Sequence, residues 1–80
     1  MITFRNARIS ENDFDALVLS NILINTTTNA YCVAYELHAT RSHATRANIA
    51  ASLARLVAAG NLVRDDFAVT GAAPAYRRIR

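Results

Sequence analysis

Residues 42–64, SHATRANIAASLARLVAAGNLVR, decide the fold, because they combine a helix start, an apolar helical face and a helix stop. Ser42 is a residue type that caps helix N-termini, and Gly60 is the type that most often ends a helix in the left-handed conformation. The apolar face between them consists of Ile49, Ala50, Leu53, Leu56 and Val57. This pattern predicts a helix over residues 43–59 that packs one face on a core.

A shorter helical pattern precedes this stretch. Ser10 and Asp13 resemble a capping box, which predicts a first helix from about residue 11 to about residue 24. Residues 25–29 then break the pattern and form a turn whose Thr and Asn side chains can cap the next element. The apolar stripe of this first helix consists of Phe14, Leu17, Val18 and Ile22.

Residues 30–40 fit two patterns, because their apolar residues alternate as in a strand and also share one face of a helix. We favour the helix for its alanine content and for the cap in front of it, although aromatic and β-branched residues at every second position favour a strand. Residues 62–69 and 75–80 read as two strands joined by a hairpin turn at residues 70–74. Residues 1–9 alternate apolar and polar side chains, as in a short strand or an extended arm.

Residues 45–64 resemble the recognition helix and first wing strand of bacterial winged-helix regulators, in which a helix ending Leu-x-x-Leu-x-x-x-Gly is followed by an apolar pair and a basic residue. The matching residues are Leu53, Leu56, Gly60, Leu62, Val63 and Arg64, with Asn61 as one extra residue. Residues 74–80 resemble the closing strand of a short wing, and the chain is similar in size to small regulators of fimbrial operons and of phages. Residues 38–44 depart from the family, because they hold neither the glycine nor the large apolar residue usual between its second and third helices.

This resemblance, which covers residues 30–80, implies an α+β, mostly α, winged helix-turn-helix fold over residues 1–80. We expect a three-helix core, a recognition helix over residues 43–59 and a two-stranded β-hairpin wing over residues 61–80, preceded by an arm or strand over residues 1–9. A chain of 80 residues has interior for one domain only. We also expect a homodimer formed through the first helix or the N-terminal segment, because Ile2, Phe4 and Ile9 would otherwise leave apolar surface exposed.

The charge pattern points to a recognition surface in the second half of the chain. The formal net charge is +3, and all nine basic residues are Arg, a type whose planar fork suits phosphates, guanine edges and protein interfaces. With the apolar face of residues 43–59 turned inward, a polar stripe is predicted on the opposite side. That stripe consists of Arg41, Thr45, Asn48, Ser52 and Arg55.

The resemblance implies that this helix enters the major groove of double-stranded DNA while the wing touches the backbone. The expected base contacts are Thr45, Arg46, Asn48 and Ser52. The expected phosphate contacts are Arg41, Ser42, His43, Arg55, Arg64, Arg77 and Arg78. The positions of Asp65 and Asp66 decide whether the wing can bind phosphate. Carboxylates on the same side as Arg64 and Arg78 would weaken phosphate binding and favour a protein partner.

Other classes of function find little support. Cys32 is the only cysteine, and His38 and His43 have no third metal ligand near them in the sequence. We therefore expect no enzyme activity, cofactor, metal or small-molecule ligand, no membrane span, and a cytoplasmic location.

Three functions remain from the sequence. The first is a sequence-specific transcription regulator, encoded by a phage or another mobile element. The alternative is a small protein-binding winged-helix module that acts as an inhibitor or adaptor of a host complex, since Arg and Tyr are enriched in protein interfaces. The third is an architectural role in replication or partition.

Overall fold

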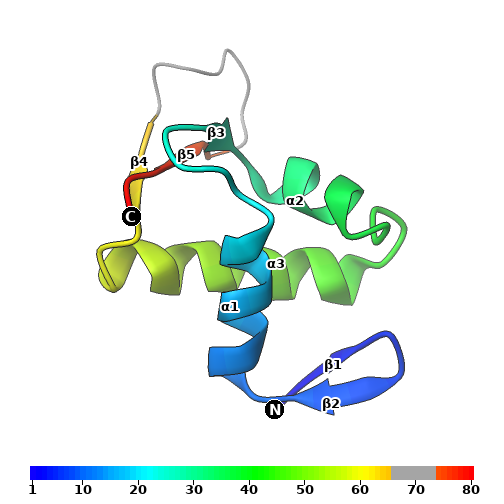
Figure 1. Ribbon diagram of the computed structural model, residues 1–80. Helices are drawn as coiled ribbons and strands as arrows, with labels where there is room; N and C mark the ends of the chain where they lie inside the picture. The colour runs from blue at the N-terminus through cyan, green and yellow to red at the C-terminus, as the bar shows by residue number, and fades with distance from the viewer. Residues whose placement is uncertain (66–73) are drawn as a thin grey trace.

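Three helices form the centre of the computed structural model, which describes residues 1–65 and 74–80 (Figure 1). They are α1 (Glu11–Ser20), α2 (Ala30–Glu36) and α3 (His43–Ala58). Each begins at a side-chain cap in which Ser10, Asn29 or Ser42 accepts a hydrogen bond from a backbone N–H three residues later. The three predicted helices and the α+β class are thus confirmed.

Two of the helices are shorter than the sequence pattern predicts. α1 ends at Ser20 rather than near residue 24, and α2 ends at Glu36 rather than near residue 40. α1 ends at its C-cap residue Asn21, because the chain then turns back so that Thr27 can pair in a sheet. After α2, His38 adopts a positive φ of 55°, which ends the helix without a glycine.

The N-terminal segment is a β-hairpin rather than a single strand or arm. Strands β1 (Ile2–Phe4) and β2 (Ala7–Ile9) pair antiparallel, and Phe4 lies opposite Ala7. The two-residue turn between them has positive φ at both Arg5 (51°) and Asn6 (64°), the conformation that matches the twist of a tight hairpin. Asn tolerates this conformation better than most residues, which makes Asn6 the visible sequence signal for the turn.

A second sheet joins the middle of the chain to its C-terminal end. Strands β3 (Thr27–Thr28), β4 (Leu62–Arg64) and β5 (Tyr76–Arg78) are antiparallel and lie in the order β3-β5-β4. The prediction of only a turn at residues 25–29 was therefore wrong, because pairing with residues about fifty positions away makes β3 a strand. The predicted strand beyond residue 65, the predicted turn up to residue 73, and Asp66 lie outside the described residues.

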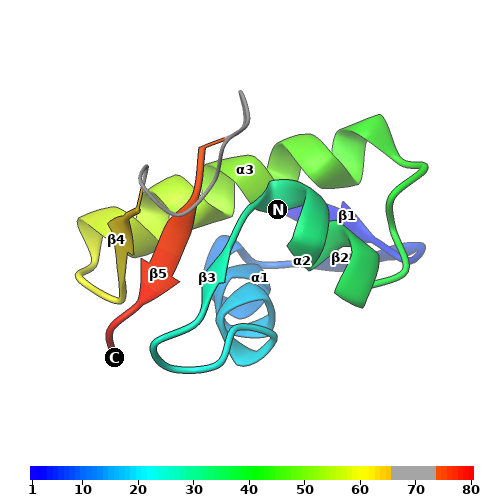
Figure 2. The same ribbon diagram turned by 90° about the horizontal axis from the view of Figure 1, so that it is seen from above.

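The two sheets lie at opposite ends of the molecule. α1 crosses α3 in Figure 1, while the β3-β5-β4 sheet lies at the C-terminal half of α3 and the β1-β2 hairpin at the other end. Figure 2 shows the same separation from above. α3 contacts both β4 and β1, so it is the element that joins the two ends.

The core forms where the three helices and both sheets meet. Most of the apolar residues predicted to face the core from the first and third helices are buried, namely Phe14, Val18, Ile22, Ile49, Leu53 and Leu56. Leu17 and Val57 are only partly covered, and the prediction that Ala50 faces the core was wrong, because its side chain is exposed. Ile2 and Phe4 also belong to this core, and the Phe4 and Phe14 rings meet edge to face at 5.9 Å. The expectation that the N-terminal segment exposes apolar side chains is therefore wrong for these two residues. This removes the argument for dimerisation through that segment, and the homodimer stays a prediction.

Candidate nucleic-acid interface

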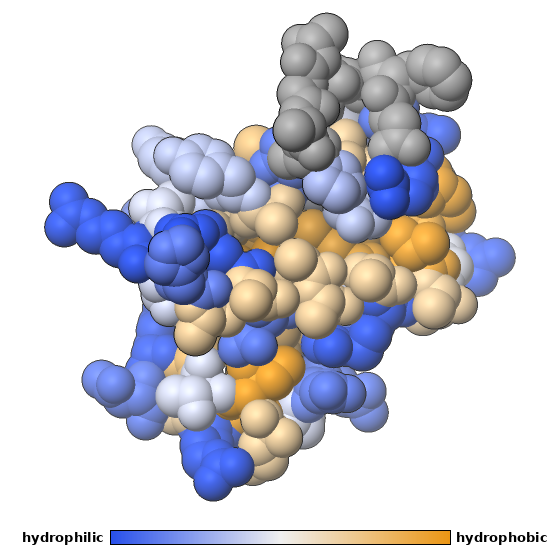
Figure 3. Space-filling view, turned by 180° about the vertical axis from the view of Figure 1, so that it is seen from behind, coloured by the Kyte–Doolittle hydropathy of each residue, from blue (hydrophilic) through white to orange (hydrophobic). Residues whose placement is uncertain are grey.

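The solvent-exposed side of α3 is lined by small side chains. Seen from behind, a pale orange band runs across the middle of the molecule along α3 (Figure 3). Its exposed members on α3 are Ala44, Ala47, Ala50, Ala51, Ala54 and Ala58. We call these six residues the alanine face. A surface without long side chains allows another macromolecule to approach the helix backbone closely.

The predicted polar stripe does not lie on this exposed side. Ser52 has no exposed surface, and Thr45 is buried as well. α1 packs against the flank of α3 next to the apolar face, so the buried arc of α3 is wider than the large apolar residues alone indicate. The predicted base contacts from Thr45 and Ser52 are therefore wrong for this structure, because both side chains are buried.

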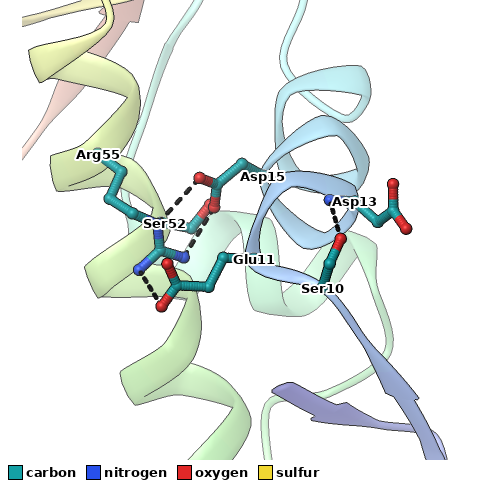
Figure 4. A network of polar contacts seen from close by, with 6 residues as sticks. All are labelled: Ser10, Glu11, Asp13, Asp15, Ser52 and Arg55. Atoms are coloured by element: carbon teal, nitrogen blue, oxygen red, sulfur yellow. Dashed lines mark hydrogen bonds and ion pairs between the residues drawn. The ribbon is translucent and has the colours of Figure 1, made fainter. Parts of the chain in front are cut away.

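Arg55 is held by carboxylates of α1 (Figure 4). Its Nε donates to Asp15 Oδ2 at 2.9 Å and its Nη2 donates to Asp15 Oδ1 at 2.8 Å, while its Nη1 lies 3.8 Å from Glu11 Oε2. Ser52 Oγ donates to the same Asp15 carboxylate at 2.6 Å. The predicted phosphate contact from Arg55 is corrected accordingly, since its guanidinium joins α3 to α1.

The pKa values of this pair shift as the contacts require. Hydrogen bonding from Arg55 lowers the pKa of Asp15, burial opposes that shift, and the Ser52 hydroxyl adds to the lowering. The pKa of Arg55 is raised, chiefly by its hydrogen bonds to Asp15. Both residues therefore carry full charge near neutral pH, and each neutralises the other.

Arg78 also has a structural role. Its Nη1 donates to the carbonyl oxygens of Leu19 at 3.1 Å and Ile22 at 2.8 Å. These carbonyls lie at the end of α1, where a cation satisfies unpaired acceptors and matches the helix dipole. Arg78 therefore caps the end of α1, and its phosphate contact stays a prediction.

The other predicted phosphate contacts on the β4-β5 hairpin have protein partners too. Arg77 Nε lies 3.7 Å from Asp65 Oδ2, which also accepts a hydrogen bond from Thr27 Oγ1 at 2.9 Å. The Arg64 guanidinium lies 5.5 Å from the centre of the Tyr76 ring. Asp65 thus lies beside Arg77, which belongs to β5. Its carboxylate reduces the positive charge of the β4-β5 pair.

The first turn of α3 is where predicted contact residues stay accessible. Arg41 and His43 are exposed and Arg46 is half-buried. Arg46 Nη2 donates to His43 Nδ1 at 3.0 Å, and neither Arg41 nor Arg46 pairs with a carboxylate in the described part of the chain. The first turn of α3 has no acidic residue, whereas that of α1 holds Glu11 and Asp13. We call Arg41, His43 and Arg46 the basic end of α3.

Two open hollows adjoin this end. One, of about 570 Å³, is lined by Tyr35, His38, Ala39, Thr40, Arg41 and Ser42. The other, of about 370 Å³, lies between the turn of the β1-β2 hairpin and the start of α3. No carboxylate lines either hollow among the residues described. Ser42, a predicted phosphate contact, is half-buried here and its hydroxyl caps α3.

Sequence reasoning missed Asp15 and Arg5 as residues that organise this region. Asp15 follows Glu11 by one helical turn, so the two carboxylates share a face of α1 that matches Arg55 in charge. That pattern is a usable signal for the α1-α3 contact. Arg5 has no comparable signal, because its guanidinium donates to a main-chain acceptor, the Leu37 carbonyl, at 2.7 Å.

The chain matches no protein-family model, no curated protein and no solved structure. Within residues 1–65 and 74–80, no helix is long and apolar enough to cross a membrane. The same residues hold no group of three or more His, Cys, Asp or Glu side chains placed to bind a metal ion.

Proposed function

We propose that this chain is a winged-helix domain that binds double-stranded DNA as a transcription regulator, with the first half of α3 in the major groove. The order of elements supports this proposal, because two consecutive helices, α2 and α3, are followed by the antiparallel pair β4-β5, which is the order of a helix-turn-helix with a wing. A helix-turn-helix places its second helix in the groove, and the hairpin then lies beside the duplex.

The observation that carries the proposal is the basic end of α3. Arg41, His43 and Arg46 are accessible at the positive end of a helix dipole, and no carboxylate of the described chain neutralises the two arginines. DNA phosphates are attracted to such an end both by its charge and by free backbone N–H groups. The arrangement therefore favours an anionic partner, such as DNA, over a basic or neutral surface.

The alanine face is compatible with a DNA groove. A major groove about 12 Å wide admits a helix, and alanine methyl groups can contact the thymine methyl group there. Arg46 and the half-buried Asn48 border the alanine face and are the proposed base contacts. Arg41 and His43 are the proposed phosphate contacts from α3, and Arg64 and Arg77 are those from the hairpin.

The test is selection of bound duplexes from a randomised pool, followed by titration of the enriched site at several salt concentrations. We expect one enriched sequence and an affinity that falls steeply with salt. Arg46→Ala and Asn48→Ala should each weaken the enriched site by about tenfold or more and relax its sequence. Arg80→Ala, at the exposed end of the chain beside Gly60, is the control that matches the charge lost in Arg46→Ala. Recovery of no duplex above background at low salt would refute the proposal.

A protein partner is the second candidate, and the alanine face favours it together with two exposed aromatic residues of α2. Tyr31 and Tyr35 are 61% and 66% exposed, one helical turn apart. Tyrosine side chains and close-packed small residues suit a protein interface.

Ala54→Arg separates the two candidates, because it adds a cation in the middle of the alanine face. Ala54 lies in the second half of α3, outside the half proposed to enter the groove, so DNA binding predicts an affinity equal to or higher than that of the wild type for this variant. A protein interface on α3 predicts that the same variant no longer captures a partner from cell extract while the wild type does.

A further inference from the structure

The β1-β2 hairpin is fixed beside the helix-turn-helix rather than projecting freely. Arg5 Nη2 donates to the Leu37 carbonyl oxygen at 2.7 Å, and the Arg5 guanidinium lies 4.9 Å from the centre of the Phe4 ring. Ile2 and Phe4 anchor the same hairpin in the core. The hairpin turn therefore has a defined position next to the end of α2.

The exposed face of this hairpin carries Thr3 and Arg8. Thr3 and Arg8 lie opposite each other in the antiparallel pair, so their side chains share the face away from Ile2 and Phe4. Thr3 also lines the open hollow of about 370 Å³, together with Ala44 and Thr45 at the start of α3. Arg8 does not line the hollow itself, but it is the cross-strand neighbour of Thr3, which does.

The charged side chains of the hairpin are arginines only, although Glu11 and Asp13 follow it in the first turn of α1. Arg5, Arg8 and Arg41 are all exposed, and no carboxylate of the described residues pairs with any of them. The hollow between the hairpin and α3 adds the amide of Asn6 and the hydroxyl of Ser42, and it lacks a carboxylate. A phosphate group near this hollow would therefore meet cations and hydrogen-bond donors.

We propose that the β1-β2 hairpin is a second arm that contacts the DNA backbone, with Arg8 as its phosphate-binding residue. The inference rests on the proposed function and extends it to the end of α3 opposite the β4-β5 hairpin. Both hairpins contact α3, and Figures 1 and 2 place them at opposite ends of the molecule. The molecule is 35 Å in its longest dimension, close to the length of one turn of B-form DNA, about 34 Å.

The test compares wild type, Arg8→Gln and Arg8→Lys on the enriched duplex, with binding titrations across salt and hydroxyl-radical footprints. Arg8→Gln should weaken binding about fivefold near 0.15 M salt on every sequence, lower the salt slope by about one, and remove protection at one edge of the footprint. Arg8→Lys keeps the charge and should restore most of the affinity. Arg80→Ala removes an equal charge at the far end of α3 and should leave that edge of the footprint intact.

The outcomes separate this inference from the proposed function. If the wild type binds the enriched duplex and Arg8→Gln binds it with the same affinity, salt slope and footprint, the second arm is refuted and the α3 contact stands. If the wild type binds no duplex, both proposals fail together. Thermal unfolding of each variant checks that Arg8, which is exposed, can be changed without unfolding the hairpin.

Discussion

The two ends of α3 carry the same residue type in opposite circumstances. Arg46, in the first half of the helix, lies on its accessible flank and pairs with no carboxylate of the described chain, whereas Arg55, in the second half, is held by Asp15 and Glu11. The difference comes from α1, which crosses α3 at its second half and brings two carboxylates with it. An arginine on this helix is therefore available for a ligand only where α1 does not reach.

This contrast also explains why the basic surface is smaller than the composition indicates. Arg55 and Arg78 both hold α1, one through carboxylates on its first turns and the other through carbonyls at its end. Arg77 lies beside Asp65. The proposed interface consequently depends most on a few residues near the start of α3, with Arg64 and Arg77 of the hairpin as additional phosphate contacts, and single substitutions near that start should have measurable effects.

The largest expected effect tests which face of α3 is buried. The comparison between Arg46 and Arg55 depends on that orientation. Leu53 is completely buried, so Leu53→Ala leaves a cavity and should lower the free energy of unfolding by about 2–5 kcal/mol. Urea denaturation followed by circular dichroism measures this loss. A loss below about 1 kcal/mol would mean that α3 is rotated, and that neither end faces the surroundings described above.

The next effect compares the two ends directly. Asp15→Ala removes charged hydrogen bonds to Arg55 and Ser52, and it should lower the free energy of unfolding by about 1.5–3 kcal/mol. Arg46→Ala removes only the contact with His43 and should change stability by less than about 0.5 kcal/mol. A double-mutant cycle of Asp15→Ala and Arg55→Ala gives the coupling between the pair. Equal losses at Arg46 and Asp15 would erase the contrast between the two ends.

The fold was largely predictable from the sequence, because caps and apolar spacing are local signals. Ser10 and Ser42 fix where α1 and α3 begin, and Leu53 and Leu56 indicate the buried face. β3 was not predictable, because a two-residue strand exists only through its pairing with β5. The second strand of the N-terminal hairpin also depended on a turn with positive φ at Arg5, a residue that does not signal such a turn.

The candidate site was less predictable, because it depends on which flank of α3 the other helices cover. Five polar residues were expected to share one exposed stripe, but two of them, Thr45 and Ser52, face the interior and Arg55 faces α1. Alanine gives no directional signal, since it is found both in cores and on surfaces. The exposed alanine face was therefore visible only once α1 and α2 were placed around α3.

A smaller effect uses pH to isolate the contribution of Asp15. Because the folded state lowers the pKa of this carboxyl below its ordinary value of 3.8, its stabilisation is fully present above that value and is lost as pH falls through the lowered one. The difference in unfolding free energy between wild type and Asp15→Asn should therefore be constant from about pH 7 to pH 5 and shrink below about pH 4. Urea titrations at each pH measure it, and a difference that does not shrink in acid would show that Asp15 is not paired as an anion.

The smallest expected effect separates the two ends in DNA binding. Arg41 is exposed beside the start of α3, so Arg41→Gln should lower the salt slope of binding by about one and weaken every duplex about fivefold near 0.15 M salt. Arg55→Gln should leave the salt slope unchanged in protein that is still folded, because the guanidinium of Arg55 is already neutralised by Asp15 and releases no counterion. Titrations at 10 °C, where destabilised variants remain folded, measure both slopes, and circular dichroism at the same temperature verifies the fold. A salt slope that changes with Arg55→Gln and not with Arg41→Gln would place the duplex at the second half of α3 instead of its start. The reason is that a change in slope identifies the arginine whose charge the DNA phosphates neutralise.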